Sequence, residues 1–165
     1  MAEELQISNT DNKKEKYDTL LPQLEALLTG EADLIANLAN TAAAFRQTFN
    51  WFWVGFYMVR GNELVLGPFQ GTIACTRIKY GRGVCGASWQ QQKSLFVPDV
   101  EKFPGHIACS SLSVSEIVVP IFNAANDVVA IIDVDSERYD VLDELDLAQL
   151  EKVAELLSKC WVSQQ

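Results

Sequence analysis

The runs Glu116-Ile-Val-Val-Pro-Ile-Phe122 and Asp127-Val-Val-Ala-Ile-Ile-Asp-Val134, joined by Asn123-Ala-Ala-Asn126, form the most strongly patterned stretch of this 165-residue chain. Two apolar runs on either side of a short turn segment are typical of an antiparallel hairpin. Because both runs are so apolar, we expect this hairpin to lie at the centre of a sheet.

A second hairpin is predicted upstream of the first. Trp51–Val59 is aromatic and β-branched, Arg60–Asn62 has the composition of a turn, and Glu63–Leu66 alternates polar and apolar residues. Further strands are predicted at Gly71–Ile78 and Leu95–Val97. Together these segments indicate a mainly antiparallel sheet.

Apolar residues at helical spacing predict helices on both sides of these strands in the sequence. The fold class is therefore α+β, with helices flanking the sheet. Residues 1–16 are polar and are expected to form an N-terminal tail, and residues 17–165 to form a single domain. The glycine-punctuated segment from Tyr80 leads into a short helix, and Pro98–Ser115 is expected to be a loop. The predicted helices are Tyr17–Thr29, Ala32–Phe49, the short one ending near Gln92, and Asp140–Trp161.

Charge and hydropathy exclude several classes of protein. Thirteen basic and 22 acidic residues give a formal charge of −9, which repels a phosphate backbone, so nucleic acid is not an expected partner. The N-terminus lacks the pattern of a secretory signal, and the longest apolar run, Trp51–Val59, is too short to span a bilayer. We expect a cytoplasmic protein without membrane contact, in which paired cysteines act in catalysis or redox sensing.

Three of the four cysteines, Cys75, Cys85 and Cys109, lie in one region with the only histidine, His106. A Cys3His zinc site is disfavoured, because structural zinc ligands usually come in close sequence pairs, and no metal is expected. A buried structural role remains open for each thiol and is favoured for Cys160, on the apolar face of the last helix. Basic residues near Cys75 and Cys85 could lower a thiol pKa or simply be solvated.

Carboxylates and a tryptophan form the other candidate groups. Asp133 and Asp135 project from one face of a strand, and Glu116 begins the partner strand. They could solvate the end of the sheet, or they could meet near the loop thiol, where mutual repulsion would keep one protonated as an acid. Trp53 is interpreted either as core or as a pocket wall for a small apolar group.

Taken together, eight blocks between residues 53 and 136 resemble the free methionine-(R)-sulfoxide reductases, which are single GAF domains, and the resemblance covers roughly residues 17 to 160. The blocks are Trp53-Val-Gly-Phe-Tyr57, Leu66-Gly-Pro-Phe-Gln-Gly71, Ala74-Cys75, Gly81-Arg-Gly-Val-Cys-Gly86, Val97-Pro-Asp-Val100, His106-Ile-Ala-Cys109, Ser115-Glu-Ile-Val-Val-Pro120 and Asp133-Val-Asp-Ser136.

The resemblance implies a GAF-like fold and thioredoxin-dependent reduction of free L-methionine-(R)-S-oxide. It makes Cys109 the catalytic cysteine, Cys75 the resolving cysteine that forms a disulfide with it, and Cys85 an auxiliary thiol. Reducing equivalents would come from thioredoxin, with no other cofactor. The resemblance is also compatible with a homodimer.

The resemblance further implies that Glu116, Asp133 and Asp135 bind and protonate the substrate and that Trp53 receives its methyl group. His106 is expected to order the loop rather than to act as a base. The chain has Ser110 where the family pattern has aspartate, and Val141 near an expected phenylalanine. The alternative from another class is a GAF sensor that binds a small molecule without turnover.

Overall fold

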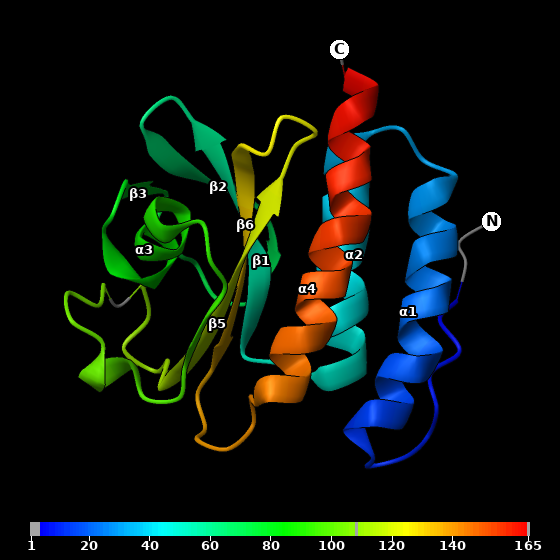
Figure 1. Ribbon diagram of the computed structural model, residues 1–165. Coiled ribbons are helices and arrows are strands. Elements are labelled where there is room, and N and C mark those ends of the chain that lie inside the picture. Colours follow the sequence, from blue (N-terminus) through cyan, green and yellow to red (C-terminus); the bar gives the residue numbers. More distant parts are fainter. Residues whose placement is uncertain (1–3, 108, 165) are drawn as a thin grey trace.

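A six-stranded antiparallel sheet forms the centre of the computed structural model, which describes residues 4–107 and 109–164 (Figure 1). The strand order is β3-β2-β1-β6-β5-β4, so the predicted central hairpin, β5 and β6, lies inside the sheet. The strands are β1 Trp53–Arg60, β2 Glu63–Gln70, β3 Arg77–Lys79, β4 Leu95–Val97, β5 Ser115–Phe122 and β6 Val128–Ser136.

Helices cover the two faces of the sheet unequally. The helices α2 (Leu34–Phe49) and α4 (Glu144–Ser158) lie on one face with α1 (Lys13–Thr29) outside them, and α3 (Gly83–Gln91) lies on the other face (Figure 1). A 3₁₀ turn at Val100–Lys102 interrupts the long loop before β5, and a second one, Lys159–Gln164, follows α4. The predicted α+β class is confirmed.

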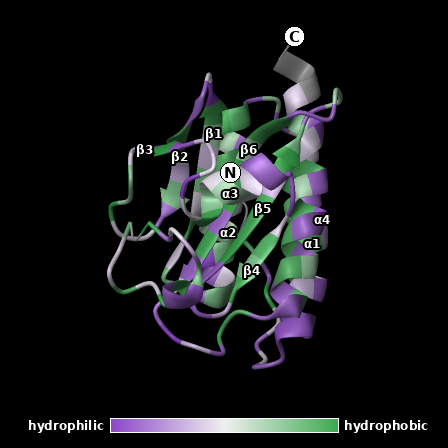
Figure 2. Cartoon of the chain, turned by 60° about the vertical axis from the view of Figure 1, so that its left-hand side comes forward, coloured by the Kyte–Doolittle hydropathy of each residue, from purple (hydrophilic) through white to green (hydrophobic). Residues whose placement is uncertain are grey.

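Alternation along the strands sends side chains into two separate cores. Val54, Phe56 and Met58 of β1 pack toward α1, α2 and α4, whereas Trp53 and Tyr57 point to the face of α3. The strands are mostly hydrophobic, while α1 and α4 carry hydrophilic stretches on their outer surfaces (Figure 2). The second core is smaller and includes Cys85, so the candidate chemistry gathers on the α3 side of the sheet.

Three helices begin at positions other than those predicted. The first starts at Lys13 rather than Tyr17, because the side chain of Asn12 caps it by accepting from the amide of Glu15. The helix α2 starts at Leu34 rather than Ala32, because the side chain of Asp33 caps it by accepting from the amide of Ala36. The last starts at Glu144 rather than Asp140. Asp140 has a left-handed φ of 59°, and Asp143 supplies the capping box that begins α4.

The predicted strand Gly71–Ile78 is wrong over most of its length. The strand β2 continues to Gln70, and Gly71, with a φ of 144°, turns the chain out of the ladder. Only Arg77–Lys79 rejoins the sheet, as β3. The residues between, including Cys75, thus cross one end of the sheet instead of extending its edge.

Within the described residues, no helix combines the length and apolar character that crossing a bilayer requires. Cys160 is buried in the larger core, as predicted for this thiol, and its sulfur accepts a hydrogen bond from the Nδ2 atom of Asn37.

Candidate active site

A disulfide joins Cys75, in the segment after β2, to Cys109, in the loop before β5. The two Cα atoms lie 5.2 Å apart, although 34 positions separate the residues in sequence. Cys109 is exposed and Cys75 is half-buried. The hydroxyl of Tyr57 donates to the carbonyl oxygen of Cys75 at 2.9 Å and lies 4.0 Å from Cys109 Sγ. The disulfide therefore ties two loops over the end of the central strands.

Strand register brings the three predicted carboxylates together beneath this disulfide. Asp135 pairs with Trp53 of β1 on one side and with Glu116 of β5 on the other, so these three residues form one row across the sheet. Asp133 lies two residues along β6, on the same face. Cys109, Asp133 and Asp135 line the same small cavities.

Burial raises the pKa of each carboxyl in this group, and neighbouring charges raise the pKa values of Glu116 and Asp133 further. Burial is the main cause for Glu116 and Asp133, followed by the neighbouring charges, and their pKa values lie well above the usual range. Burial raises the pKa of Asp135 to about 6, partly offset by a hydrogen bond with Ser113. Among the described residues, Oδ1 of Asp133 is buried with no hydrogen-bond partner. Glu116 and Asp133 are thus the carboxyls that the site shifts furthest toward the protonated form.

Close packing fixes the indole of Trp53 beside these acids. Its Nε1 donates to the carbonyl oxygen of Thr72 at 3.0 Å, and its ring stacks on Phe69 with centroids 5.2 Å apart. A Cβ atom on Gly55 would lie 2.7 Å from the indole, and one on Gly71 would lie 2.5 Å from it. Both positions therefore require glycine for the ring to keep this place.

Cys85, at the start of α3, is buried against the carboxylates. Its Sγ lies 3.9 Å from Oε1 of Glu116, and burial, reinforced by the charges of Asp133 and Glu116, raises the pKa of the thiol well above its usual value. The thiol therefore stays protonated. Its sulfur and one oxygen each of Glu116 and Asp133 lie within 4.8 Å of one another, a spacing that could hold a divalent cation.

His106 faces the same acids from the loop. Its Nε2 lies 3.7 Å from Oε2 of Glu116, beyond hydrogen-bond length. Burial lowers the pKa of His106, so the ring is neutral near pH 7 and forms no ion pair with Glu116. The loop-ordering role expected for His106 stays a prediction.

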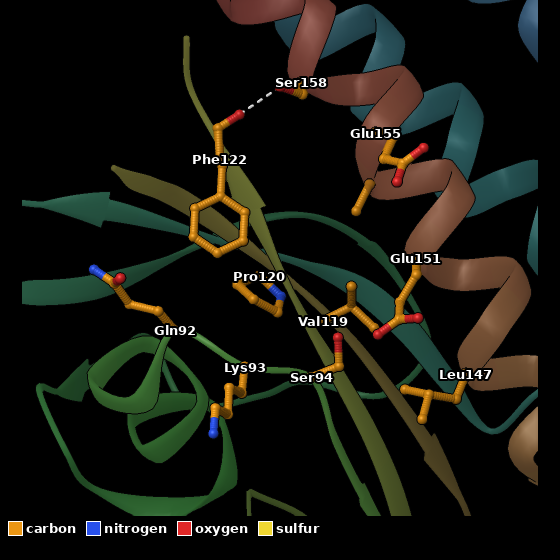
Figure 3. A pocket seen from close by; sticks show the side chains of 11 residues that line it. Gln92, Lys93, Ser94, Val119, Pro120, Phe122, Leu147, Glu151, Glu155 and Ser158 are labelled. Carbon is orange, nitrogen blue, oxygen red and sulfur yellow. Dashed lines mark hydrogen bonds between the residues drawn. The ribbon is translucent and has the colours of Figure 1, made fainter. Parts of the chain in front are cut away.

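The cavities at the disulfide are small. One of about 30 Å³ lies between Cys85, His106 and Glu116, and one of about 10 Å³ lies beside Trp53 and Tyr57. A larger groove of about 570 Å³ lies elsewhere, between α4 and β5 (Figure 3). Its lining includes Glu151, Glu155 and Lys93 but no thiol or histidine, so it carries none of the predicted chemistry.

The sequence and the fold of this chain are similar to those of known proteins. A GAF domain family model matches residues 28–160. The chain is 60% identical over 158 residues to GAF domain-containing protein A of Dictyostelium discoideum, covering 95% of this chain and 99% of that protein. It is 38% identical to the free methionine-R-sulfoxide reductase of Saccharomyces cerevisiae, covering 98% of this chain and 94% of that protein.

A crystal structure of free methionine-R-sulfoxide reductase from Neisseria meningitidis in complex with its substrate superposes with a TM-score of 0.93 at 48% identity, covering 97% of this chain and 96% of that one. The chain belongs to the free methionine-R-sulfoxide reductases of the GAF family. The resemblance stated from the sequence motifs is thereby confirmed.

In this member of the free methionine-R-sulfoxide reductases, every predicted site residue lies on one side of the sheet. Cys75 and Cys109 are bonded near Glu116, Asp133 and Asp135, Cys85 contacts Glu116 from α3, and Trp53 lies in the row of Asp135 and Glu116. The catalytic, resolving and auxiliary roles of the three thiols remain predictions.

Sequence reasoning missed three residues that complete the site. Tyr57 contacts both halves of the disulfide, Gly55 makes room for the indole, and Ser113 bonds to Asp135. Alternation from Trp53 places Gly55 and Tyr57 on the same strand face, which is the signal that could have found them. Ser113 has no such signal, because it lies in a loop whose path depends on the disulfide.

Proposed function

We propose that this protein reduces free L-methionine-(R)-S-oxide to L-methionine with electrons from thioredoxin in the cytosol. The observation that carries the proposal is the bonded pair Cys75–Cys109 directly above three buried carboxylates of raised pKa. A thiol and an acid within one site are what sulfoxide reduction requires. A homodimer is compatible with this proposal, since all the groups invoked belong to one chain.

The first step joins Cys109 to the substrate. Its thiolate attacks the sulfoxide sulfur, which becomes electrophilic when its oxygen takes a proton. We assign the proton to Glu116 or Asp133, because burial and the neighbouring charges raise their pKa values furthest and so favour their protonated forms. Methionine leaves, and its former oxygen stays on Cys109 as a sulfenic acid.

The second step regenerates the thiol. The Cys75 thiol condenses with the sulfenic acid, releasing water and forming the disulfide. A dithiol of the thioredoxin type then attacks the disulfide, becomes oxidised itself and returns two thiols to the protein. Cys85 is buried, with only 3% of its surface exposed, so it is a poor first partner for a dithiol in solution, which supports its auxiliary assignment.

Selection of the free amino acid is proposed to follow from the charge of Asp135, the third carboxyl of the group. With a pKa of about 6, Asp135 is ionised at pH 7.5 and is proposed to bind the substrate ammonium group. Within a peptide that nitrogen is an uncharged amide, so this interaction is lost. Trp53, which lies in the same row as Asp135, is proposed to receive the methyl group and so to favour one epimer.

The deciding experiment is NADPH oxidation coupled through thioredoxin reductase and thioredoxin. Four substrates are compared, namely the R and S sulfoxides of methionine, each free and within a peptide. We expect turnover of the free R epimer alone, its loss in Cys109→Ser, and its retention in the control Cys160→Ala. Binding of the sulfoxide without turnover in the wild type would instead support a sensor.

A further inference from the structure

We propose that Ile73, Ile107 and Leu112 form the surface on which a dithiol protein docks to reduce the Cys75–Cys109 disulfide. The inference rests on the proposed redox cycle and names the surface by which that cycle recognises its reductant. These three side chains are called the apolar collar below.

The collar stands out against the rest of the described surface. Only six large apolar side chains are exposed among the described residues, and three of them, Ile73, Ile107 and Leu112, form the collar. Their exposed fractions are 90%, 38% and 57%. Exposed apolar groups that gather at one place mark interaction sites, whereas scattered ones need no explanation.

Chain geometry holds the collar close to the sulfur atoms. Ile73 and Ile107 each precede a disulfide cysteine by two residues, and Leu112 follows Cys109 by three, so each Cα lies within ~12 Å of a bonded cysteine. Ile73 and Cys109 line the same small cavity. A hydrogen bond from the amide of Leu112 to Oγ of Ser110 keeps this residue in the turn beside Cys109.

The reaction at this place requires a partner thiol at the surface. A partner thiolate attacks one sulfur of the Cys75–Cys109 bond and forms a mixed disulfide, while the other sulfur leaves as a thiolate and takes a proton. The second partner thiol then attacks the mixed disulfide, so the partner ends oxidised and this protein regains two thiols. Cys109 is the more exposed of the two bonded residues, so we assign the first attack to its sulfur.

The collar selects a protein over a small thiol. A hydrophilic thiol such as glutathione gains nothing from apolar side chains beside the disulfide, whereas a protein whose thiol lies on an apolar surface buries them on docking. Interfaces between redox partners are small and transient. Three apolar side chains around one disulfide are enough to form an interface of this kind.

The test measures reduction of the oxidised protein in a single turnover, without methionine sulfoxide. The double variant Ile73→Gln, Leu112→Gln is compared with the wild type, and Ile35→Gln on α2, where the side chain is about as exposed as Leu112, serves as control. Thioredoxin, dithiothreitol and glutathione are the three reductants, and the second-order rate constant is measured for each. Because the substrate is absent, the result does not depend on whether the protein reduces methionine sulfoxide.

We expect the rate constant for thioredoxin to fall ~10-fold or more in the double variant and to stay unchanged in Ile35→Gln. The rate constants for dithiothreitol and glutathione should stay within about 2-fold of the wild type, because their attack uses no collar contact. An unchanged rate with thioredoxin would overturn the proposal. An equal loss with all three reductants would also overturn it, since it would show altered access to the disulfide rather than lost docking.

Discussion

Asp135 sets how the proposed reaction depends on pH. Because its pKa is about 6, protonation below that value removes the charge proposed to hold the substrate ammonium group. We expect KM to rise ~10-fold for each pH unit below 6, with KM already raised and independent of pH in Asp135→Asn. Steady-state kinetics between pH 5 and 8 measure this. A wild-type KM that stays constant down to pH 5 would refute the ammonium role.

The same carboxyl is expected to weaken the folded state. Its folded pKa of about 6 lies above the ordinary 3.8, so the folded state binds more protons and stability falls as pH rises from 3.8 through 6. Replacing it by an amide should therefore raise the free energy of unfolding at pH 7.5, by about 3 kcal/mol at most. Urea unfolding of Asp135→Asn tests this, with the exposed Asp127→Asn as control. A gain at pH 7.5 that does not shrink toward pH 4 would exclude this cause.

Gly55 fixes the indole of Trp53 through the absence of a side chain. A Cβ atom at this position would lie 2.3 Å from Cβ of Phe69 and 2.7 Å from the indole. Gly55→Ala should shift the ring, lower kcat/KM for the R epimer and destabilise the fold by ~1–3 kcal/mol. Gly30→Ala is the control, since nothing lies within 4 Å of that added atom. An unchanged kcat/KM for the R epimer would remove Trp53 from substrate selection.

At the scale of elements, the first and last helices are joined through one buried acid. Asp146, in the first turn of α4, is fully buried and accepts at 2.7 Å from the hydroxyl of Tyr17 and at 2.6 Å from Lys13. Tyr17→Phe leaves one carboxylate oxygen without its donor and should cost about 1–2 kcal/mol of folding free energy. Lys14→Ala, which breaks an exposed pair with Asp18, should cost under ~0.5 kcal/mol. An equal loss of unfolding free energy in the two variants would show that the buried hydrogen bond to Asp146 stabilises the fold no more than the exposed ion pair does.

Elements with a strong period could be predicted from the sequence, and elements fixed by loop contacts could not. Alternation and apolar runs placed β1, β5 and β6, which are the strands that carry Trp53 and the acids. Periodicity failed at Gly71, where a left-handed backbone ended the ladder. Helix starts also shifted, because caps rather than apolar spacing define the first turn.

The candidate site, too, could be predicted from the sequence only in part. The acids follow from strand alternation, since residues two apart share a face, and their meeting with Glu116 follows from the hairpin. The pairing of Cys75 with Cys109 came only from family resemblance, because a sequence separation of 34, which includes β3, α3 and β4, leaves their spacing uninformative. The raised pKa values of the carboxyls come mainly from burial, and the extent of that burial is known only from the folded structure.

At the scale of the whole molecule, the disulfide couples redox state to access. It holds the segment after β2 and the loop before β5 together over the acids, where the cavities measure only about 30 and 10 Å³. A water molecule requires ~10–15 Å³, so an amino acid does not fit. Product must therefore leave before the bond closes, and substrate must wait until a dithiol opens it.

Access can be measured directly as binding of free methionine-(R)-sulfoxide by calorimetry. The oxidised wild type should bind none up to millimolar concentration, because the closed disulfide leaves no room at the acids. Cys109→Ser cannot form the bond or reduce the ligand, and we expect it to bind with a Kd at least ~10-fold below the highest concentration tested. Oxidised Cys160→Ala, which keeps the disulfide, should behave as the wild type. Equal affinity of oxidised wild type and Cys109→Ser would show that the two loops leave the site open in both redox states, and the coupling would have to be abandoned.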